Sequence, residues 1–183
     1  MVLTTAQLQA LKADIAAAGD LSVFPNTSDG NFAIAQLYNL SAVPAFIVWA
    51  TDVPVRNVYD AITWANLTPN DTPDTTQLWE NRALMCQAKQ INLQIMLQGQ
   101  ATVNGAKANI RAGLQDALTA IPSGTGGAPR AAGWATGVQP SLQRTATRIE
   151  KLLAAGVGTS ASPATMTVEG AIGHEDVGAA RNS

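Results

Sequence analysis

The stretch TTQLWENRALMCQAKQINLQIMLQ, residues 75–98, contains the longest helical pattern in the chain and decides the fold class. Its large apolar side chains recur every three or four residues, which is the spacing of one face of an α-helix. Asp74 and Gln77 resemble a capping pair at the start, and Gly99 follows as a stop signal. We therefore expect a long central helix whose core-facing side chains are Leu84, Ala88, Ile91 and Ile95.

Similar apolar spacing predicts five further helices around this one. They are expected over about residues 4–18, 28–40, 52–62, 105–121 and 141–154. Ser, Thr or Asp residues that can cap a helix precede several of these segments, and Gly or Pro follows. The chain is therefore predicted to be mainly α, with a helical bundle and a long central helix forming a body over residues 1–155.

Two segments of this body lack a clear helical pattern. Residues 45–49, AFIVW, form a short apolar run that is compatible with a strand or with a buried helix. Residues 122–140 are rich in Gly, Pro and Ala and are expected to be irregular. Within them, SGTGG at 123–127 lacks the Lys of a phosphate-binding loop, so a linker is expected.

The C-terminal segment, residues 156–183, contains too few large apolar side chains to fold alone. Part of it alternates with the period-two pattern of a strand. An isolated strand is unstable in water, but it can add to a sheet edge of another chain. We therefore expect an extended docking tail that adds a strand to a partner through Thr165, Met166, Thr167, Val168 and Glu169.

Charged residues are sparse along the whole chain. They make up 13% of the sequence and leave a net charge of -2, whereas an average soluble domain is about 25% charged. A low-charge surface is easier to bury, because fewer ions lose their hydration. This composition favours extensive burial between subunits, although an Ala-, Thr- and Gln-rich chain without such a role has similar numbers.

The charges are also unevenly distributed. Residues 1–81 contain two basic and eight acidic residues, a net charge of -6, whereas residues 82–151 contain eight basic and two acidic residues, a net charge of +6. Two explanations remain open. The oppositely charged halves pair head to tail between subunits, or they pair within one fold.

A basic stripe is predicted on the last helix of the body, where Arg144, Arg148 and Lys151 are spaced at i, i+4 and i+7. Three roles remain open for it: contact with nucleic-acid phosphates, contact with acidic groups of a neighbouring subunit, or simple solvation. The sequence pI near 5.2 argues against a dedicated DNA-binding protein.

The side chains that could carry catalysis are scattered. The one histidine, His174, lies in the Gly-rich C-terminal segment, and the one cysteine, Cys86, lies inside the long helical pattern, where a buried thiol is expected. The sequence has no nucleophile-elbow motif and no multi-cysteine metal pattern. We therefore expect no enzyme, no cofactor and no bound metal.

The apolar stretches are short. None approaches the ~18 residues of a membrane-spanning helix. The first residues, MVLTTAQ, lack the basic start and apolar run of a signal peptide. A soluble, intracellular protein without a membrane partner is expected.

From Pro44 to about Lys151, the sequence resembles a family of tailed-bacteriophage virion proteins. The segments that carry the resemblance are PAFIVW (44–49), TW (63–64), TPNDTPD (68–74), WENRAL (79–84), KQINLQ (89–94), LQG (97–99), IRAGLQDAL (110–118) and IPSG (121–124).

The overall plan, a helical body with a C-terminal tail, resembles the head–tail adaptor (connector) proteins of such phages. The resemblance implies a homo-oligomeric ring of about twelve copies, docked under the portal protein and clasping it with the tail. It further implies tail or nozzle proteins as partners, possible non-specific contact with DNA in the channel, and a place in the virion after assembly in the bacterial host cytoplasm.

Two other classes remain open from the sequence. One is another virion structural protein, such as a capsid-decorating or tail-completion subunit. The other is an accessory protein of DNA packaging.

Overall fold

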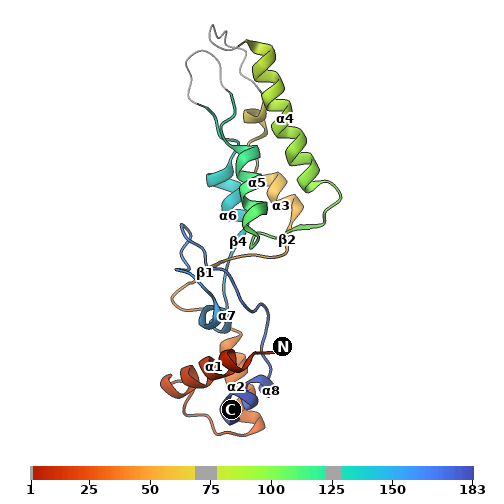
Figure 1. Cartoon of the computed structure of the whole chain (residues 1–183). Coiled ribbons are helices and arrows are strands. Elements are labelled where there is room, and N and C mark those ends of the chain that lie inside the picture. The colour runs from red at the N-terminus through yellow and green to blue at the C-terminus, as the bar shows by residue number, and fades with distance from the viewer. Residues whose placement is uncertain (1, 69–77, 123–128) are drawn as a thin grey trace. The chain divides into compact units, whose positions relative to one another are not determined.

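The structure is a computed structural model that describes residues 2–68, 78–122 and 129–183 (Figure 1). Helices dominate these residues, and no strand among them is longer than three residues. The chain is therefore mainly α, as its apolar spacing predicts. The expected capping pair Asp74 and Gln77 and the Gly-rich residues 123–127 lie outside the described residues.

The chain divides into two compact units. Unit 1 comprises Met1–Trp49 and Arg144–Ser183, and unit 2 comprises Ala50–Gln143. The sequence-based division after residue 155 differs from this one, because unit 1 contains both ends of the chain and the middle segment packs on itself as unit 2. Each unit is described separately below.

Unit 1 contains four α-helices: α1 (Thr5–Ala17), α2 (Ser28–Tyr38), α7 (Arg148–Leu153) and α8 (His174–Asn182). Threonines start three of them, because the hydroxyl oxygens of Thr4, Thr27 and Thr147 each accept a hydrogen bond from a backbone N–H in the first turn. The helices share one core, which includes Leu11, Ile15, Leu21, Ile34, Ala35, Tyr38, Ile149, Leu153, Ile172, Val177 and Ala180.

The C-terminal segment corrects the prediction of an extended tail. Residues 174–182 form α8, which packs against α1 and α2 (Figure 1). Arg181 holds it there by donating to the backbone oxygens of Phe24 and Pro25, at 2.9 and 3.0 Å. The C-terminal segment has too few apolar side chains to fold alone. Helices from the other end of the chain bury the few that it has.

A small two-stranded sheet is formed by two segments that are far apart in the sequence. β1 (Ile47–Trp49) pairs with β4 (Gln143–Thr145), so the apolar run at 45–49 contains a strand and not a helix. The predicted helix over 141–154 is therefore wrong in its first part. Ala146 donates to the Phe46 oxygen at 2.8 Å, and this pairing delays the helix until Thr147 caps α7.

The described residues of unit 2 include α3 (Val55–Ala61), α4 (Trp79–Leu97) and α5 (Ala108–Leu118). They also include a 3₁₀ turn η1 (Trp64–Leu67), a π-type turn η2 (Trp134–Val138) and a short α6 (Gln139–Ser141). β2 (Val53–Pro54) pairs antiparallel with β3 (Thr102–Val103). α4 packs on α5, and Leu114 and Leu118 of α5 are fully buried.

The orientation of α4 differs from the prediction. Its buried side chains are Arg82, Cys86, Leu93 and Leu97. The face expected in the core is exposed instead, with 62% of Leu84, 54% of Ile91 and 70% of Ile95 open to solvent. Among the described residues, no helix is long and apolar enough to cross a membrane.

Candidate functional site

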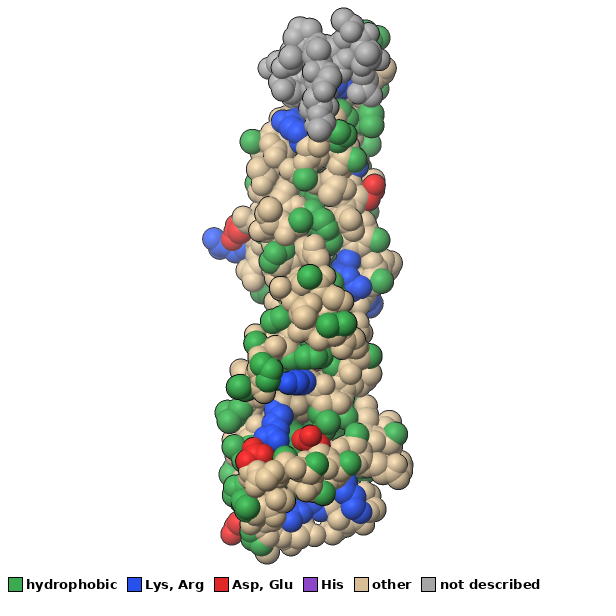
Figure 2. All heavy atoms as spheres, turned by 90° about the vertical axis from the view of Figure 1, so that its left-hand side faces the viewer, with side chains coloured by type: hydrophobic (Ala, Val, Ile, Leu, Met, Phe, Trp, Pro, Cys, Tyr) green, Lys and Arg blue, Asp and Glu red, His purple; other side chains and the backbone are tan. Residues whose placement is uncertain are grey.

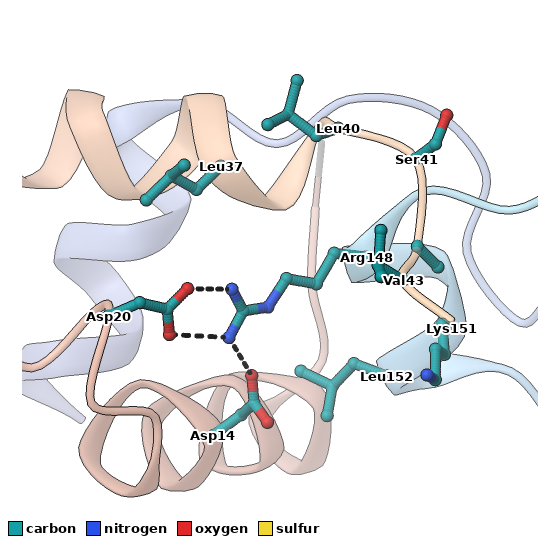
Figure 3. A pocket seen from close by; sticks show the side chains of 10 residues that line it. Asp14, Asp20, Leu37, Leu40, Ser41, Val43, Arg148, Lys151 and Leu152 are labelled. Atoms are coloured by element: carbon teal, nitrogen blue, oxygen red, sulfur yellow. Dashed lines mark hydrogen bonds and ion pairs between the residues drawn. The ribbon is translucent and has the colours of Figure 1, made fainter. Parts of the chain in front are cut away.

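Unit 1 has a partly polar pocket of about 720 Å³ beside α1, α2 and α7 (Figure 3). Carboxylates from α1 and from the turn after it face Arg148 of α7, and leucines form part of the wall. The residues that line the pocket are Asp14, Asp20, Leu37, Leu40, Ser41, Ala42, Val43, Arg148, Lys151 and Leu152.

Arg148 occupies the middle of this pocket (Figure 3). Its Nη1 donates to Asp20 Oδ2 at 2.6 Å, its Nη2 lies 3.8 Å from Asp14 Oδ2, and its guanidinium carbon lies 5.1 Å from the centre of the Tyr38 ring. Tyr38 in turn donates its hydroxyl to Asp14 at 2.6 Å. The guanidinium is therefore held by two carboxylates and one aromatic face of the same unit.

The protonation of these groups follows from the contacts. The hydrogen bond from Arg148 lowers the pKa of Asp20, and the same bond raises the pKa of Arg148. Burial raises the pKa of Tyr38, and the hydrogen bond to Asp14 raises it further. At neutral pH Asp20 is therefore ionised, Arg148 is charged and Tyr38 is a neutral phenol.

Arg144, on β4, forms a second and more buried network. Its two terminal nitrogens each donate to one carboxylate oxygen of Glu150 at 2.7 Å, and Nη2 also donates to Glu169 at 3.1 Å. Glu150 is only 2% exposed. It accepts two further hydrogen bonds, from the backbone N–H groups of Thr147 at 2.9 Å and Gly170 at 3.2 Å.

These contacts set the charge state of the buried acid. Burial alone would raise the pKa of Glu150, but the hydrogen bonds from Arg144, Thr147 and Gly170 lower it to about 2. The hydrogen bond with Glu150 also raises the pKa of Arg144. Glu150 is therefore ionised at neutral pH and ties β4, α7 and the segment before α8 together.

The basic stripe predicted for one helix does not form as a single face. Arg144 lies on β4, whereas Arg148 and Lys151 lie on α7. Arg144 and Arg148 form ion pairs with carboxylates of the same chain. Within the described residues, Lys151 forms no ion pair. The Arg148–Asp20 pair also joins the basic segment to the acidic one within one unit.

The predicted strand over residues 165–169 is also used within the chain. Thr165 exchanges two backbone hydrogen bonds of 2.9 Å with Ala155, and Thr167 donates its hydroxyl to the Leu153 oxygen at 2.6 Å. Val168 is half-buried against the helix core of unit 1, and Met166 is half-buried against a smaller cluster of Val48, Ala146 and Ala164. Only Thr165 forms a bridge, and residues 166–169 do not form a strand.

Sequence reasoning missed Asp14, Asp20, Tyr38 and Glu150 as parts of these networks. For Glu150 a signal was present, because Thr147 and Glu150 have the spacing of a capping box and form one in the structure. For the other three residues the partners are far apart in sequence, so no local pattern identifies them.

A third feature is an apolar surface on α4 in unit 2. We call Leu84, Ala88, Ile91 and Ile95 the outer stripe. All four side chains are exposed, and they lie on the side of α4 opposite its buried face. Figure 2 shows another face of the molecule, the left-hand side of Figure 1, where charged side chains are few among hydrophobic and uncharged ones. Large exposed apolar surfaces of this kind are typical of protein–protein contacts.

The two residues considered for catalysis lie in different units. Cys86 is buried in α4, and burial raises the pKa of its thiol, so the reactive thiolate is disfavoured. His174 is the first residue of α8. Within residues 2–68, 78–122 and 129–183, no three His, Cys, Asp or Glu side chains are grouped so that they could hold a metal ion.

Three features of the described residues are available for binding. They are the ammonium of Lys151, the leucine wall of the pocket and the outer stripe of α4. Comparison of the chain with protein-family models, with curated proteins and with solved structures found no match.

Proposed function

We propose that this chain is a structural subunit of a tailed-bacteriophage particle, and specifically a head–tail adaptor. In this proposal about twelve copies form a ring between the portal and the tail. The chain acts by binding its neighbours and carries out no catalysis. Its partners are further copies of itself, the portal and the tail or nozzle proteins.

The observation that carries the proposal of a structural subunit is the outer stripe of α4, because it is a surface that another chain is expected to cover. A helix that is apolar on two opposite faces is expected where both faces are covered. In the single chain only one face is covered, because more than half of Leu84, Ile91 and Ile95 is exposed. The stripe lies inside residues 44–151, the part that resembles phage virion proteins, and the low charge of the chain fits burial between subunits.

The charge networks favour a structural role over an accessory role in DNA packaging. Arg144 and Arg148, two of the three residues considered for phosphate contact, are bound to carboxylates of unit 1. Phosphate contact through them would require these ion pairs to open. Lys151 remains for occasional contact with DNA.

Docking on the portal is proposed to use the surface of the folded C-terminal segment. Donation of residues 165–169 as a free strand would require Thr165 to leave Ala155 and Thr167 to leave Leu153. The leucine-walled pocket with Lys151 at its rim lies in the same unit and is open in the single chain.

Deletion of the gene in its phage tests the proposal. An adaptor is needed to join the two halves of the particle, so we expect DNA-filled heads and separate tails in electron micrographs, with joining restored by a plasmid copy. Quantitative mass spectrometry of wild-type particles should then give about a dozen copies. Intact infectious particles without the chain, or hundreds of copies per particle, would contradict the adaptor assignment.

A further inference from the structure

α4 presents two apolar faces that lie on opposite sides of one helix. Each residue advances the helix by about 100°, so Leu84, Ile91 and Ile95 fall on the side opposite Leu93 and Leu97. The inner pair is 2% exposed, whereas the outer stripe is 54–70% exposed at its three large side chains. Lines of Gln and Asn separate the two faces: Asn81, Gln87, Asn92 and Gln94.

We infer that the outer stripe binds the outer stripe of a second copy of this chain, with the two α4 helices antiparallel. The residues of the stripe are spaced by four, three and four positions, which is the a/d seam of a coiled coil. Ala88 supplies a small side chain within the seam, so the helices can approach closely there. At about 1.5 Å per residue the seam is about 16 Å long.

The flanks of the seam identify a copy of the chain as the partner. The four positions beside the seam are Met85, Gln87, Asn92 and Gln94, and all are uncharged. Two identical seams therefore meet without repulsion between like charges, and a charged partner would find no opposite charge there. A neutral self-pairing surface fits these flanks better than either a basic or an acidic partner does.

The remaining charges of α4 select the antiparallel arrangement. Arg82 is buried, and the ammonium of Lys89 binds Asp116 on α5 at 3.7 Å, so neither points along the seam. Glu80 lies beside the seam near the start of α4. A parallel pair would place the two Glu80 carboxylates side by side, whereas an antiparallel pair places them at opposite ends.

This inference goes beyond the proposed ring. An antiparallel pair is two-fold symmetric and closes at two copies, whereas a ring requires a head-to-tail contact on other surfaces. The two contacts can therefore exist together or fail separately. A seam of this length is shorter than a standard interface, so the pair should dissociate on dilution.

Sedimentation velocity at increasing protein concentration tests the pairing. We expect the wild-type chain to move from monomer to dimer or larger multiples of two. Ile91→Glu should weaken this step by more than about tenfold, because it places two carboxylates in an apolar seam. Val23→Glu is the matched control: Val23 is 73% exposed and lies in unit 1, so this variant should associate like the wild type. Both variants should stay folded, with the melting temperature lowered by no more than about 2–8 °C, the shift that corresponds to about 1 kcal/mol.

Cross-linking provides a second readout that does not depend on the charge change. Ala88→Cys should give covalent dimers with a short bis-maleimide, whereas Val23→Cys should not. The natural Cys86 is 1% exposed and should not react in the folded chain. A wild-type chain that stays monomeric at all concentrations, an Ile91→Glu variant that associates like the wild type, or an Ala88→Cys variant without cross-links would each overturn the inference.

Discussion

At the scale of single residues, the buried carboxylate of Glu150 makes the clearest prediction. Its pKa is lowered from 4.5 to about 2 in the folded chain. A carboxyl group whose pKa is lower in the folded chain stabilises the fold at pH values above its pKa in the unfolded chain. This stabilisation is lost as the pH falls toward its pKa in the folded chain. The shift corresponds to about 3 kcal/mol. The free energy of unfolding should therefore decrease by up to that amount, through this group, between about pH 5 and pH 2.

Glu150→Gln tests this assignment. The variant should be less stable than the wild type at pH 7, and the difference should shrink as the pH falls, as measured by urea unfolding at each pH. Glu169→Gln is the control, since Glu169 also contacts Arg144 but its side chain is 37% exposed. Its removal should cost less than about 1 kcal/mol. An identical pH dependence in Glu150→Gln and the wild type would show that Glu150 is not the linked group.

Gly158 makes a second prediction at this scale. Its φ is +73°, and a Cβ built on it would lie 2.1 Å from Cε2 of Phe46. Gly158→Ala should therefore destabilise the chain by about 1–3 kcal/mol, through backbone strain and the displaced ring. Gly19→Ala is the matched control, because no atom lies within 4 Å of its added Cβ. Equal unfolding free energies for the two variants would contradict the steric argument.

At the scale of elements, the orientation of α4 predicts which of two substitutions destabilises the chain more. The sequence alone predicts the opposite order, because it places Ile91 in the core. Leu93→Asp should remove most of the stability of unit 2, because an unpaired carboxylate in the core costs several kcal/mol. Ile91→Asp should cost about 1 kcal/mol, since Ile91 is 54% exposed. Circular dichroism melts of the two variants measure this. A folded Leu93→Asp variant beside an unfolded Ile91→Asp variant would restore the orientation predicted from sequence.

The same helix shows why sequence predicts an element more readily than its orientation. The apolar spacing correctly predicts that residues 79–97 are helical. However, both faces of α4 repeat with helical spacing, so periodicity cannot say which face is inside. The choice depends on α5, which packs on the face of Leu93 and Leu97 and is separate in sequence. The predicted helix over 141–154 fails for a similar reason, because β1 pairs with residues 143–145 from about a hundred positions earlier.

At the scale of the whole molecule, the candidate sites follow from contacts between distant parts of the chain. Arg148 meets Asp20 across 128 positions of sequence, and Arg181 meets Asn31 across 150. A sequence shows that Arg148 is a cation on a helix, but the partner that neutralises it is determined only when the two ends of the chain fold together. The same contacts explain why a segment that looks like a free tail is part of unit 1.

This joining of the two ends yields the last prediction. Deletion of residues 157–183 removes Ile172, Val177 and Ala180 from the core that α1, α2 and α7 share. It also removes two hydrogen bonds of the Asn39 side chain, which donates to the backbone oxygen of Ile172 and accepts from its backbone N–H, each at 3.0 Å. We therefore expect the loss of far more helix than the nine residues of α8, as α1, α2 and α7 unfold with it.

Far-ultraviolet circular dichroism of purified chains measures this loss directly. Deletion of residues 182–183 alone is the control, because it leaves Ile172, Val177 and Ala180 in place and should preserve the helix signal. If the long deletion lowered the signal only by the share of α8 and left the melting temperature unchanged, the C-terminal segment would be a detachable tail. In that case strand donation to a partner chain would again be the simpler interpretation of residues 165–169.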